Sequence, residues 1–176
     1  AVIVRFFNTV GPRQVGEYGM VLPRFVARAM SGRPIEVHGD GKQSRCFCDV
    51  RDAAPALLRL LGTPACHGRV FNLGNDRSIE IGQLAALVRD TRGSASPIEL
   101  VPYDKAFGPG FDDLRRREPD LSRIRAAIGF QPRIPLEQTI RDIAAQLASR
   151  EAGPVASPMG GGATRGDAGS GQGAAS

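Results

Sequence analysis

The first seven residues, AVIVRFF, form an almost uninterrupted apolar run of branched and aromatic side chains. Such a run is typical of a strand inside a parallel sheet, with both of its faces covered by other elements. It ends abruptly at Asn8, and the residues that follow include Gly11 and Pro12. Because a buried strand of this kind needs a layer on each side, the run favours an α/β architecture.

Strand and helix patterns alternate along the rest of the chain, which again predicts an α/β fold. Strands are expected at residues 1–7, 35–38, 44–50, 70–73 and 98–101, and helices at 22–30, about 50–61, 78–88, 119–128 and 136–147. Asp49 or Asp52 is expected to cap the second helix, with Pro55 in its first turn. Residues 103–113 are expected to form a loop. Residues 1–150 are expected to form the folded region, and the Gly/Ala/Ser-rich residues 151–176 a disordered tail.

Composition excludes several classes of partner. The formal net charge is +5, but the arginines are scattered and aromatic residues make up only 6% of the chain. A nucleic-acid site concentrates charge and aromatic side chains on one face, so no nucleic-acid partner is expected. No segment approaches the ~18 apolar residues of a membrane span, and no cleavage site follows the apolar start. We therefore expect no membrane partner and a cytoplasmic location.

Cysteine and histidine spacing does not predict a metal site. Cys46, Cys48 and Cys66 are an odd set, and only His38 and His67 could join them. No four-ligand zinc spacing results. Reduced, buried thiols in a cytosolic protein are the expected state.

The segment GDGKQS, residues 39–44, resembles a glycine-rich dinucleotide turn only in part. That turn needs a strand before it and a helix after it, so that a pyrophosphate can lie at the helix N-terminus. Here the third glycine is missing and the segment SRCFCDV that follows is predicted to be a strand. The segment is therefore interpreted as a hairpin turn.

Two polar residues are candidates for binding an anion. Asn8 follows the first strand, and ligands of open parallel sheets collect at the carboxyl ends of strands. Its carboxamide can bind a sugar diphosphate, or it can simply bond to its own turn. Arg45 lies among apolar strand residues and can hold phosphate oxygens with its rigid fork, or it can be a solvated edge residue. The run 115–117 is interpreted as a solvated face, because acidic residues surround it.

Several segments together resemble a known family. They are RFFNTVGPRQ, GMVLPRF, RPIEVHGDGKQSRCFCDV, FNLGN and REPDLSRIRAAIGFQP, in this order over residues 1–148. They look like the C-terminal half of NAD-dependent nucleotide-sugar epimerases and decarboxylases, of the extended short-chain dehydrogenase/reductase family. The resemblance implies the last parallel strands of a Rossmann-type sheet plus a small α/β substrate-binding region. It also implies NAD as cofactor and a homodimeric complete enzyme.

The resemblance also implies roles for particular residues. Phe7 matches the position that touches the nicotinamide end of NAD. The positions that match the nucleoside-diphosphate-sugar site are Asn8, Val21, Leu22, Glu36, Val37, His38, Arg45, Phe47 and Asp113. The implied ligand is a UDP-sugar, and the implied activity is similar to that of UDP-glucose 4-epimerase. A decarboxylase fragment and a non-catalytic nucleotide-sugar-binding relic are the alternatives.

The sequence also departs from the family pattern. The family's catalytic base is a tyrosine with a lysine four residues later, whereas Tyr18 is followed at that spacing by Leu22 and Tyr103 by Phe107. The glycine-rich NAD turn is missing as well. Both normally precede the first strand, so the chain is expected to be a truncated enzyme that is inactive alone, sticky and marginally stable. Decarboxylases of the family carry an arginine where Met20 stands, which favours an epimerase.

Overall fold

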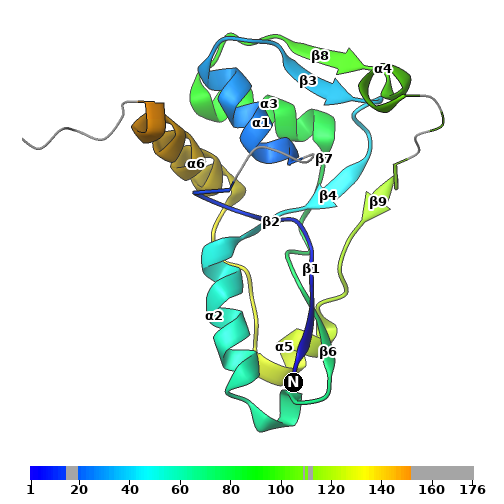
Figure 1. Ribbon diagram of the computed structural model, residues 1–176, viewed down its shortest axis with the longest axis vertical. Helices are drawn as coiled ribbons and strands as arrows, with labels where there is room; N and C mark the ends of the chain where they lie inside the picture. The colour runs from blue at the N-terminus through cyan, green and yellow to red at the C-terminus, as the bar shows by residue number, and fades with distance from the viewer. Residues whose placement is uncertain (15–19, 109, 111–112, 152–176) are drawn as a thin grey trace, which may run out of the picture.

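The computed structural model describes residues 1–14, 20–108, 110 and 113–151 (Figure 1). Tyr18 and the predicted tail beyond residue 151 lie outside these residues. The strands are β1 (Ile3–Phe6), β2 (Thr9–Val10), β3 (Ile35–His38), β4 (Ser44–Cys46), β5 (Cys48–Asp49), β6 (Val70–Leu73), β7 (Ser78–Glu80), β8 (Ile98–Val101) and β9 (Arg116–Arg117). The helices are α1 (Val21–Met30), α2 (Val50–Leu61), the short 3₁₀ helix at Pro64–Cys66, α3 (Ile81–Arg92), α4 (Tyr103–Phe107), α5 (Ser122–Ile128) and α6 (Leu136–Glu151).

The part of the molecule drawn at the bottom of Figure 1 is built on a parallel pair of strands, β1 and β6, with α2 and α5 beside it. The pairing runs from Ile3 opposite Val70 to Phe6 opposite Leu73. Phe71 and Leu73 of β6 are fully buried and pack with residues of α2 and α5 in one hydrophobic core. The predicted parallel strands of an α/β fold are therefore confirmed.

The upper part contains a second hydrophobic core. Here α1, α3 and α6 pack against one another, and β3 pairs in parallel with β8. Leu22, Val26, Ile35, Leu84 and Ile140 are fully buried in this core. The apolar residues of α1 lie three and four positions apart, which places them on the face that meets α3 and α6.

Short strands connect the two parts. β2 pairs in parallel with β5, and β4 lies between β7, which is antiparallel to it, and β9, which is parallel. The predicted hairpin at residues 39–44 is wrong, because β3 pairs with β8 and β4 pairs with β7 and β9. The turn instead carries the chain from one sheet to another, and Gly39 and Gly41 adopt the positive φ angles, 79° and 73°, that this change of direction requires.

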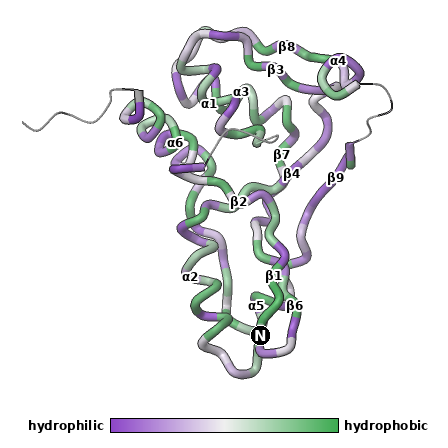
Figure 2. Tube along the Cα trace, in the orientation of Figure 1, coloured by the Kyte–Doolittle hydropathy of each residue, from purple (hydrophilic) through white to green (hydrophobic). Residues whose placement is uncertain are grey.

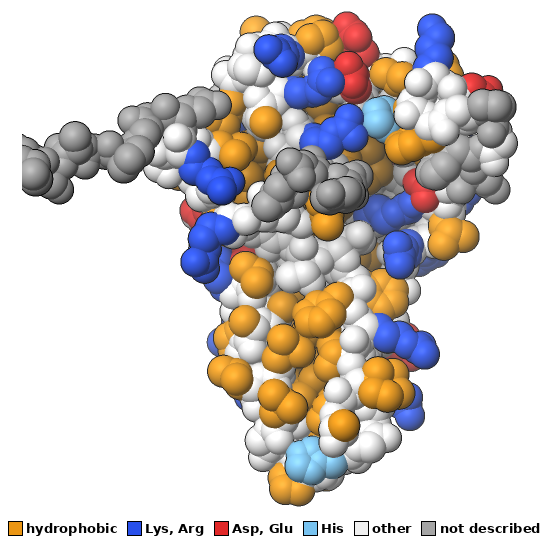
Figure 3. Space-filling model, viewed as in Figure 1, with side chains coloured by type: hydrophobic (Ala, Val, Ile, Leu, Met, Phe, Trp, Pro, Cys, Tyr) orange, Lys and Arg blue, Asp and Glu red, His pale blue; other side chains and the backbone are white. Residues whose placement is uncertain are grey.

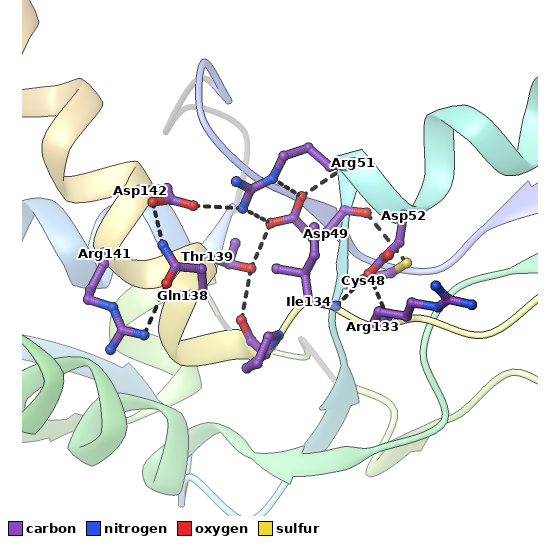
Figure 4. A network of polar contacts seen from close by, with 11 residues as sticks. Cys48, Asp49, Arg51, Asp52, Arg133, Ile134, Gln138, Thr139, Arg141 and Asp142 are labelled. Carbon is purple, nitrogen blue, oxygen red and sulfur yellow. Dashed lines mark hydrogen bonds and ion pairs between the residues drawn. The ribbon is translucent and has the colours of Figure 1, made fainter.

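A network around Asp49 joins the two parts (Figure 4). The Asp49 carboxylate is buried and accepts hydrogen bonds from the Arg51 backbone and guanidinium, which makes it the N-cap of α2. It also accepts a hydrogen bond from the Thr139 hydroxyl on α6. Arg51 in turn pairs with Asp142 on α6 at 2.7 Å. With Asp49 as the cap, Pro55 is the sixth residue of α2 and lies beyond the first turn, contrary to the prediction.

Two further predictions need correction. Residues 103–107 form α4 within the segment that was expected to be a loop. The side chains of β1 are not covered on both faces, because Ile3 is 56% and Phe6 is 51% exposed. Figure 3 shows an exposed apolar face, coloured orange, over β1 and α2 in the lower part of the molecule. The exposed large hydrophobic residues of these two elements are Ile3, Phe6, Val50, Leu58 and Leu61.

The hydropathy of the strands differs between the lower part of the molecule and the connecting strands. Figure 2 shows β1 among the hydrophobic segments, whereas β9 is hydrophilic. In the described part of the chain, no helix has the length and apolar composition needed to cross a lipid bilayer.

Candidate functional site

A pocket of about 330 Å³ opens where the start of α1, the end of β3, the strand β4, α4 and β9 come together. Its volume lies within the range of about 300–1,000 Å³ that small-molecule sites occupy. Because the resemblance implies a nucleoside diphosphate sugar as ligand, we call it the nucleotide pocket, and its lining residues are Asn8, Val21, Arg24, Phe25, Glu36, His38, Gln43, Arg45, Ile81, Tyr103, Phe107, Asp113 and Arg117. Residues from seven separate segments therefore form one concave surface.

Asn8 lies at the carboxyl end of β1, in a backbone conformation with φ of 39°. Its Nδ2 atom donates a hydrogen bond of 3.0 Å to the Cys46 carbonyl, and its own carbonyl accepts one of 3.2 Å from the Cys48 amide. The side chain thus bonds across to β4, and it lines the pocket instead of serving only its own turn. Asparagine tolerates positive φ better than most residues, which explains its presence at this bend.

Arg45 reaches the same pocket from β4. Its Nη2 atom pairs with Asp113 Oδ1 at 2.5 Å, and its Nη1 atom donates to the carbonyls of Ser44 and Leu114 at 2.7 and 2.8 Å. The side chain is only 12% exposed, so Arg45 is not a solvated edge residue. A guanidinium fork suits phosphate oxygens, and here both of its terminal nitrogens are held by protein oxygens.

One end of the nucleotide pocket is aromatic. Tyr103 and Phe107 are four residues apart on α4 and therefore share one helix face. The Phe107 ring meets the His38 ring edge to face, with centroids 5.0 Å apart. Gly39 leaves room for the Tyr103 ring, because a Cβ atom at Gly39 would lie 2.5 Å from Tyr103 Cε2. Such an end suits a flat heterocycle.

Both neutral and charged titratable side chains line this pocket. Burial and the neighbouring Arg24 charge lower the pKa of His38, so its imidazole is neutral at pH 7. Burial and the Asp113 carboxylate raise the pKa of Tyr103, which keeps its hydroxyl protonated and 3.4 Å from Asp113 Oδ2. Glu36 pairs with Arg28 at 2.8 Å. His38 and Tyr103 are therefore neutral, whereas charged side chains, those of Arg24, Glu36, Arg45, Asp113 and Arg117, line the same pocket.

A second pocket of about 340 Å³ adjoins the first and shares Asn8, Val21 and Arg117 with it. We call it the adjoining pocket. Leu22 and Phe47 line it together with Phe6 at the tip of β1. It is largely apolar, and it lies where β1 ends and α1 begins.

The structure thus brings most of the predicted site residues to two connected pockets. Asn8, Val21, Glu36, His38, Arg45 and Asp113 line the nucleotide pocket, and Leu22 and Phe47 line the adjoining one. Val37 and Phe7 line neither. The Val37 side chain is fully buried in the upper core. Phe7 packs against Gly74, so that a Cβ atom added at Gly74 would lie 2.8 Å from Phe7 Cβ.

Sequence reasoning missed several lining residues. Arg117 is exposed, as the interpretation of residues 115–117 as a solvated face predicts. It also lines both pockets, because β9 pairs with β4 and places Arg117 opposite Arg45. Gln43 is 5% exposed, and its Nε2 atom donates to the His38 carbonyl. Pairing between segments 70 residues apart is not readable from local patterns, so no sequence signal pointed to Arg117. The even spacing of Gln43 and Arg45 along one strand was the available signal for Gln43.

Comparisons with known proteins identify similar sequences and a similar fold. Residues 1–74 match the model of the NAD dependent epimerase/dehydratase family. The chain is 35% identical over 141 residues to UDP-N-acetyl-alpha-D-glucosaminuronate decarboxylase of Bacillus cytotoxicus, covering 80% of the chain and 44% of that relative. It is 37% identical over 136 residues to UDP-glucuronic acid decarboxylase 4 of Arabidopsis thaliana, covering 77% of the chain and 29% of that relative.

Solved structures share the fold. UDP-glucose 4-epimerase of Thermotoga maritima, determined with UDP-glucose, superposes with a TM-score of 0.71 at 26% identity, over 85% of this chain and 46% of that one. UDP-glucuronic acid 4-epimerase of Bacillus cereus, in complex with UDP-glucuronic acid and NAD, gives a TM-score of 0.74 at 21% identity, over 85% and 45%. The second comparison supports the fold alone.

Parallel strands with helices on them and a pocket at the strand ends define a Rossmann-type α/β protein of the extended short-chain dehydrogenase/reductase class. Within this class, the chain belongs to the NAD-dependent epimerase/dehydratase family. It spans less than half the length of the relatives described above.

Proposed function

We propose that this chain binds a nucleoside diphosphate sugar, specifically a UDP-sugar, across the nucleotide and adjoining pockets. The observation that carries the proposal is the placement of Arg45, Arg117 and Asn8 on one pocket whose far end is aromatic. A guanidinium fork suits a diphosphate, and an aromatic wall suits a pyrimidine ring. The names of the relatives and neighbours, which act on or contain UDP-sugars, support the same ligand class.

The proposed orientation follows the polarity of the two pockets. The base lies at the end formed by His38 and Phe107, beside Glu36. The diphosphate lies near Arg45, Arg117 and Asn8. Asp113 accepts hydrogen bonds from the ribose hydroxyls.

The sugar then enters the adjoining pocket against Phe47, past Val21, and the buried Leu22 supports the wall of this pocket. Val37 has a buried side chain and contributes only through its backbone at the edge of β3. Both pockets share Asn8 and Arg117, so a ligand that spans them has to cross these two residues.

The chemistry of the whole protein is also part of the proposal. The resemblance favours an epimerase similar to UDP-glucose 4-epimerase. Decarboxylation of a UDP-uronic acid is the second candidate, because relatives of 32–37% identity carry decarboxylase names. Both reactions start from the same ligand class, so the binding site serves either one. The complete enzyme is proposed to be cytoplasmic and homodimeric.

NAD is the cofactor of the family, and the described residues fit contact with only one end of the dinucleotide. A dinucleotide pyrophosphate sits where a glycine-rich turn joins a strand to a helix, whereas the turn at residues 39–41 joins β3 to β4. The described residues therefore do not form that part of an NAD site. Phe7, at the end of β1, is proposed to meet the nicotinamide end.

We propose that the chain alone performs no turnover. Its two lysines are Lys42 and Lys105, and neither follows a tyrosine at the spacing of the family's acid–base pair. Incubation of the chain with NAD and UDP-glucose or UDP-glucuronic acid should leave the sugar unchanged by proton NMR. Conversion of either sugar would contradict this part of the proposal.

Calorimetric titration tests the binding itself. UDP and UDP-glucose should bind the chain, and Asn8→Ala and Arg45→Gln should each weaken binding about tenfold, because each removes a group that faces the ligand. Arg89→Gln is the matched control, since Arg89 pairs with Asp90 on the exposed side of α3 and lines neither pocket. Unchanged affinity in both site variants, or no affinity in the unmodified chain, would refute the proposed function.

A further inference from the structure

Both terminal nitrogens of Arg45 are already engaged by the protein. Nη1 donates to two carbonyl oxygens, and Nη2 donates to Asp113 Oδ1 at 2.5 Å. The carbonyl contacts hold the guanidinium plane in place and carry little charge. The carboxylate contact is different, because it puts a full negative charge on the group that is proposed to bind the diphosphate.

Asp113 is held at this position by a second contact. Its Oδ2 atom lies 3.4 Å from the Tyr103 hydroxyl, and its side chain is 31% exposed. Both Asp113 and Arg45 line the nucleotide pocket. The carboxylate therefore lies in the path of any anion that approaches Arg45 Nη2.

An anion that binds Arg45 at Nη2 either displaces this carboxylate or lies directly beside it, because the two groups are 2.5 Å apart. Without a new hydrogen-bond donor, the carboxylate would repel the incoming charge across a few ångströms of poorly screened space. Inorganic pyrophosphate has no alcohol hydroxyl to relieve this repulsion, and its P–OH groups are largely ionised at neutral pH. A nucleoside diphosphate can relieve it, because its ribose hydroxyls can donate to the carboxylate while its phosphate takes the guanidinium.

We propose that the Arg45–Asp113 pair is a selectivity filter, which admits a ligand only when it brings a phosphate for Arg45 and a hydroxyl donor for Asp113 together. The inference rests on the proposed function and assigns to Asp113 a role in excluding bare phosphates. Asp113 here is a specificity-determining residue, and the exchange involves no covalent step. In the protein without ligand, the same pair holds the segment at residues 113–114 on β4.

The unmodified full chain gives the first test, by calorimetric titration with UDP, 2′,3′-dideoxy-UDP and inorganic pyrophosphate. UDP should bind more tightly than the dideoxy compound, and pyrophosphate should bind most weakly. Equal affinities for UDP and dideoxy-UDP would overturn the inference. If UDP itself does not bind, the proposed function fails first, so the two failures are distinguishable.

Asp113→Asn gives the second test, because it keeps the shape and removes the charge that competes for Arg45. Affinity for pyrophosphate should rise on the order of fivefold, the range of a partly exposed ion pair, and the penalty for dideoxy-UDP should shrink. Asp113→Ser should give the same changes if the asparagine variant fails to fold. A filter role predicts this gain for pyrophosphate, whereas a purely structural role predicts a loss for every ligand.

Asp90→Asn is the matched control. Asp90 pairs with Arg89 at 2.9 Å, is 65% exposed on α3 and does not line the nucleotide pocket. It changes the net charge by the same amount, so it reports the general attraction of anions to a more basic chain. An equal gain in pyrophosphate affinity in Asp90→Asn and Asp113→Asn would overturn the filter.

Discussion

The Thr139 hydroxyl on α6 donates a hydrogen bond of 2.7 Å to the Asp49 carboxylate, which caps α2. α6 packs in the upper hydrophobic core and α2 in the lower one. A buried carboxylate with these partners therefore connects two cores that are otherwise separate clusters. Its removal leaves Arg51 with Asp142 as its remaining carboxylate partner, and Thr139 with only its longer hydrogen bond of 3.4 Å to the Pro135 carbonyl.

Asp49→Ala should lower the free energy of unfolding by about 2 kcal/mol, since it removes a helix cap and a buried carboxylate that accepts hydrogen bonds from Thr139 and from the partly exposed Arg51. Urea unfolding followed by circular dichroism measures the change. Asp90→Ala is the control, because Asp90 is 65% exposed where it pairs with Arg89. That control should change stability by about 0.5 kcal/mol or less, and a similar loss in both variants would contradict the assigned role of Asp49.

The contribution of Asp49 to the free energy of unfolding should be lost at acid pH. Burial opposes its ionisation, but the hydrogen bonds from Arg51 and Thr139 outweigh burial and hold its pKa below the ordinary value. The stabilisation is therefore complete above pH ~3.9, the pKa of an unfolded aspartate, and is lost as pH falls through the lower pKa of the folded state. The stability difference between the unmodified chain and Asp49→Asn should be constant from pH 5 to 7 and should narrow below pH 4 (both pH ranges are approximate).

His38 should titrate below about pH 6.5 in the folded chain, because burial and the Arg24 charge both disfavour its protonated form. NMR of the imidazole Hε1 signal measures the pKa directly, with the urea-unfolded chain as reference. Arg24→Gln should move the pKa of His38 upward. A pKa at or above the unfolded value in the unmodified chain would show that His38 is not buried as described.

Arg117→Gln should weaken UDP binding about tenfold, because Arg117 lines both pockets beside the proposed diphosphate position. Arg116→Gln is a closely matched control. Arg116 is adjacent in sequence, is 74% exposed and pairs with Glu118. If calorimetry shows the same loss for both variants, general charge attraction explains the effect and Arg117 has no specific role.

The apolar face over β1 and α2 should promote self-association of the isolated chain. Leu58 is 72% exposed there, and Leu58→Lys should shift the chain toward monomer in sedimentation velocity. Leu100→Lys serves as the control, since Leu100 is 62% exposed on β8 in the upper part. Equal effects of the two substitutions would indicate that association is not specific to this face.

Local patterns in the sequence predicted the longer elements well. The strands at residues 35–38, 70–73 and 98–101 and the helix ending at Met30 are confirmed, because each carries several apolar residues at a period set by its own geometry. Two-residue strands such as β2 and β9 carry no such period. Their positions follow from contacts with distant segments, so they could not be predicted.

The site residues also divide into those that neighbouring sequence indicates and those that are positioned by contacts with distant segments. Asn8 and Arg45 stood out by the chemistry of their immediate neighbours, and the family resemblance pointed to Glu36 and Asp113. Arg117 could not be identified, because its place in the pocket depends on the pairing of β9 with β4. The predicted hairpin failed for a related reason, since β3 finds its partner about 60 residues further along the chain, a non-local choice.

The two pockets meet at a shared wall formed by Asn8, Val21 and Arg117. Under the proposed function, this wall separates the pocket that binds the nucleotide, which all UDP-sugars share, from the pocket that binds the sugar, which differs among them. Substitutions at Leu22 or Phe47 can retune which sugar is accepted while the grip on the nucleotide stays intact. One fold can in this way bind different sugars that are linked to the same nucleoside diphosphate.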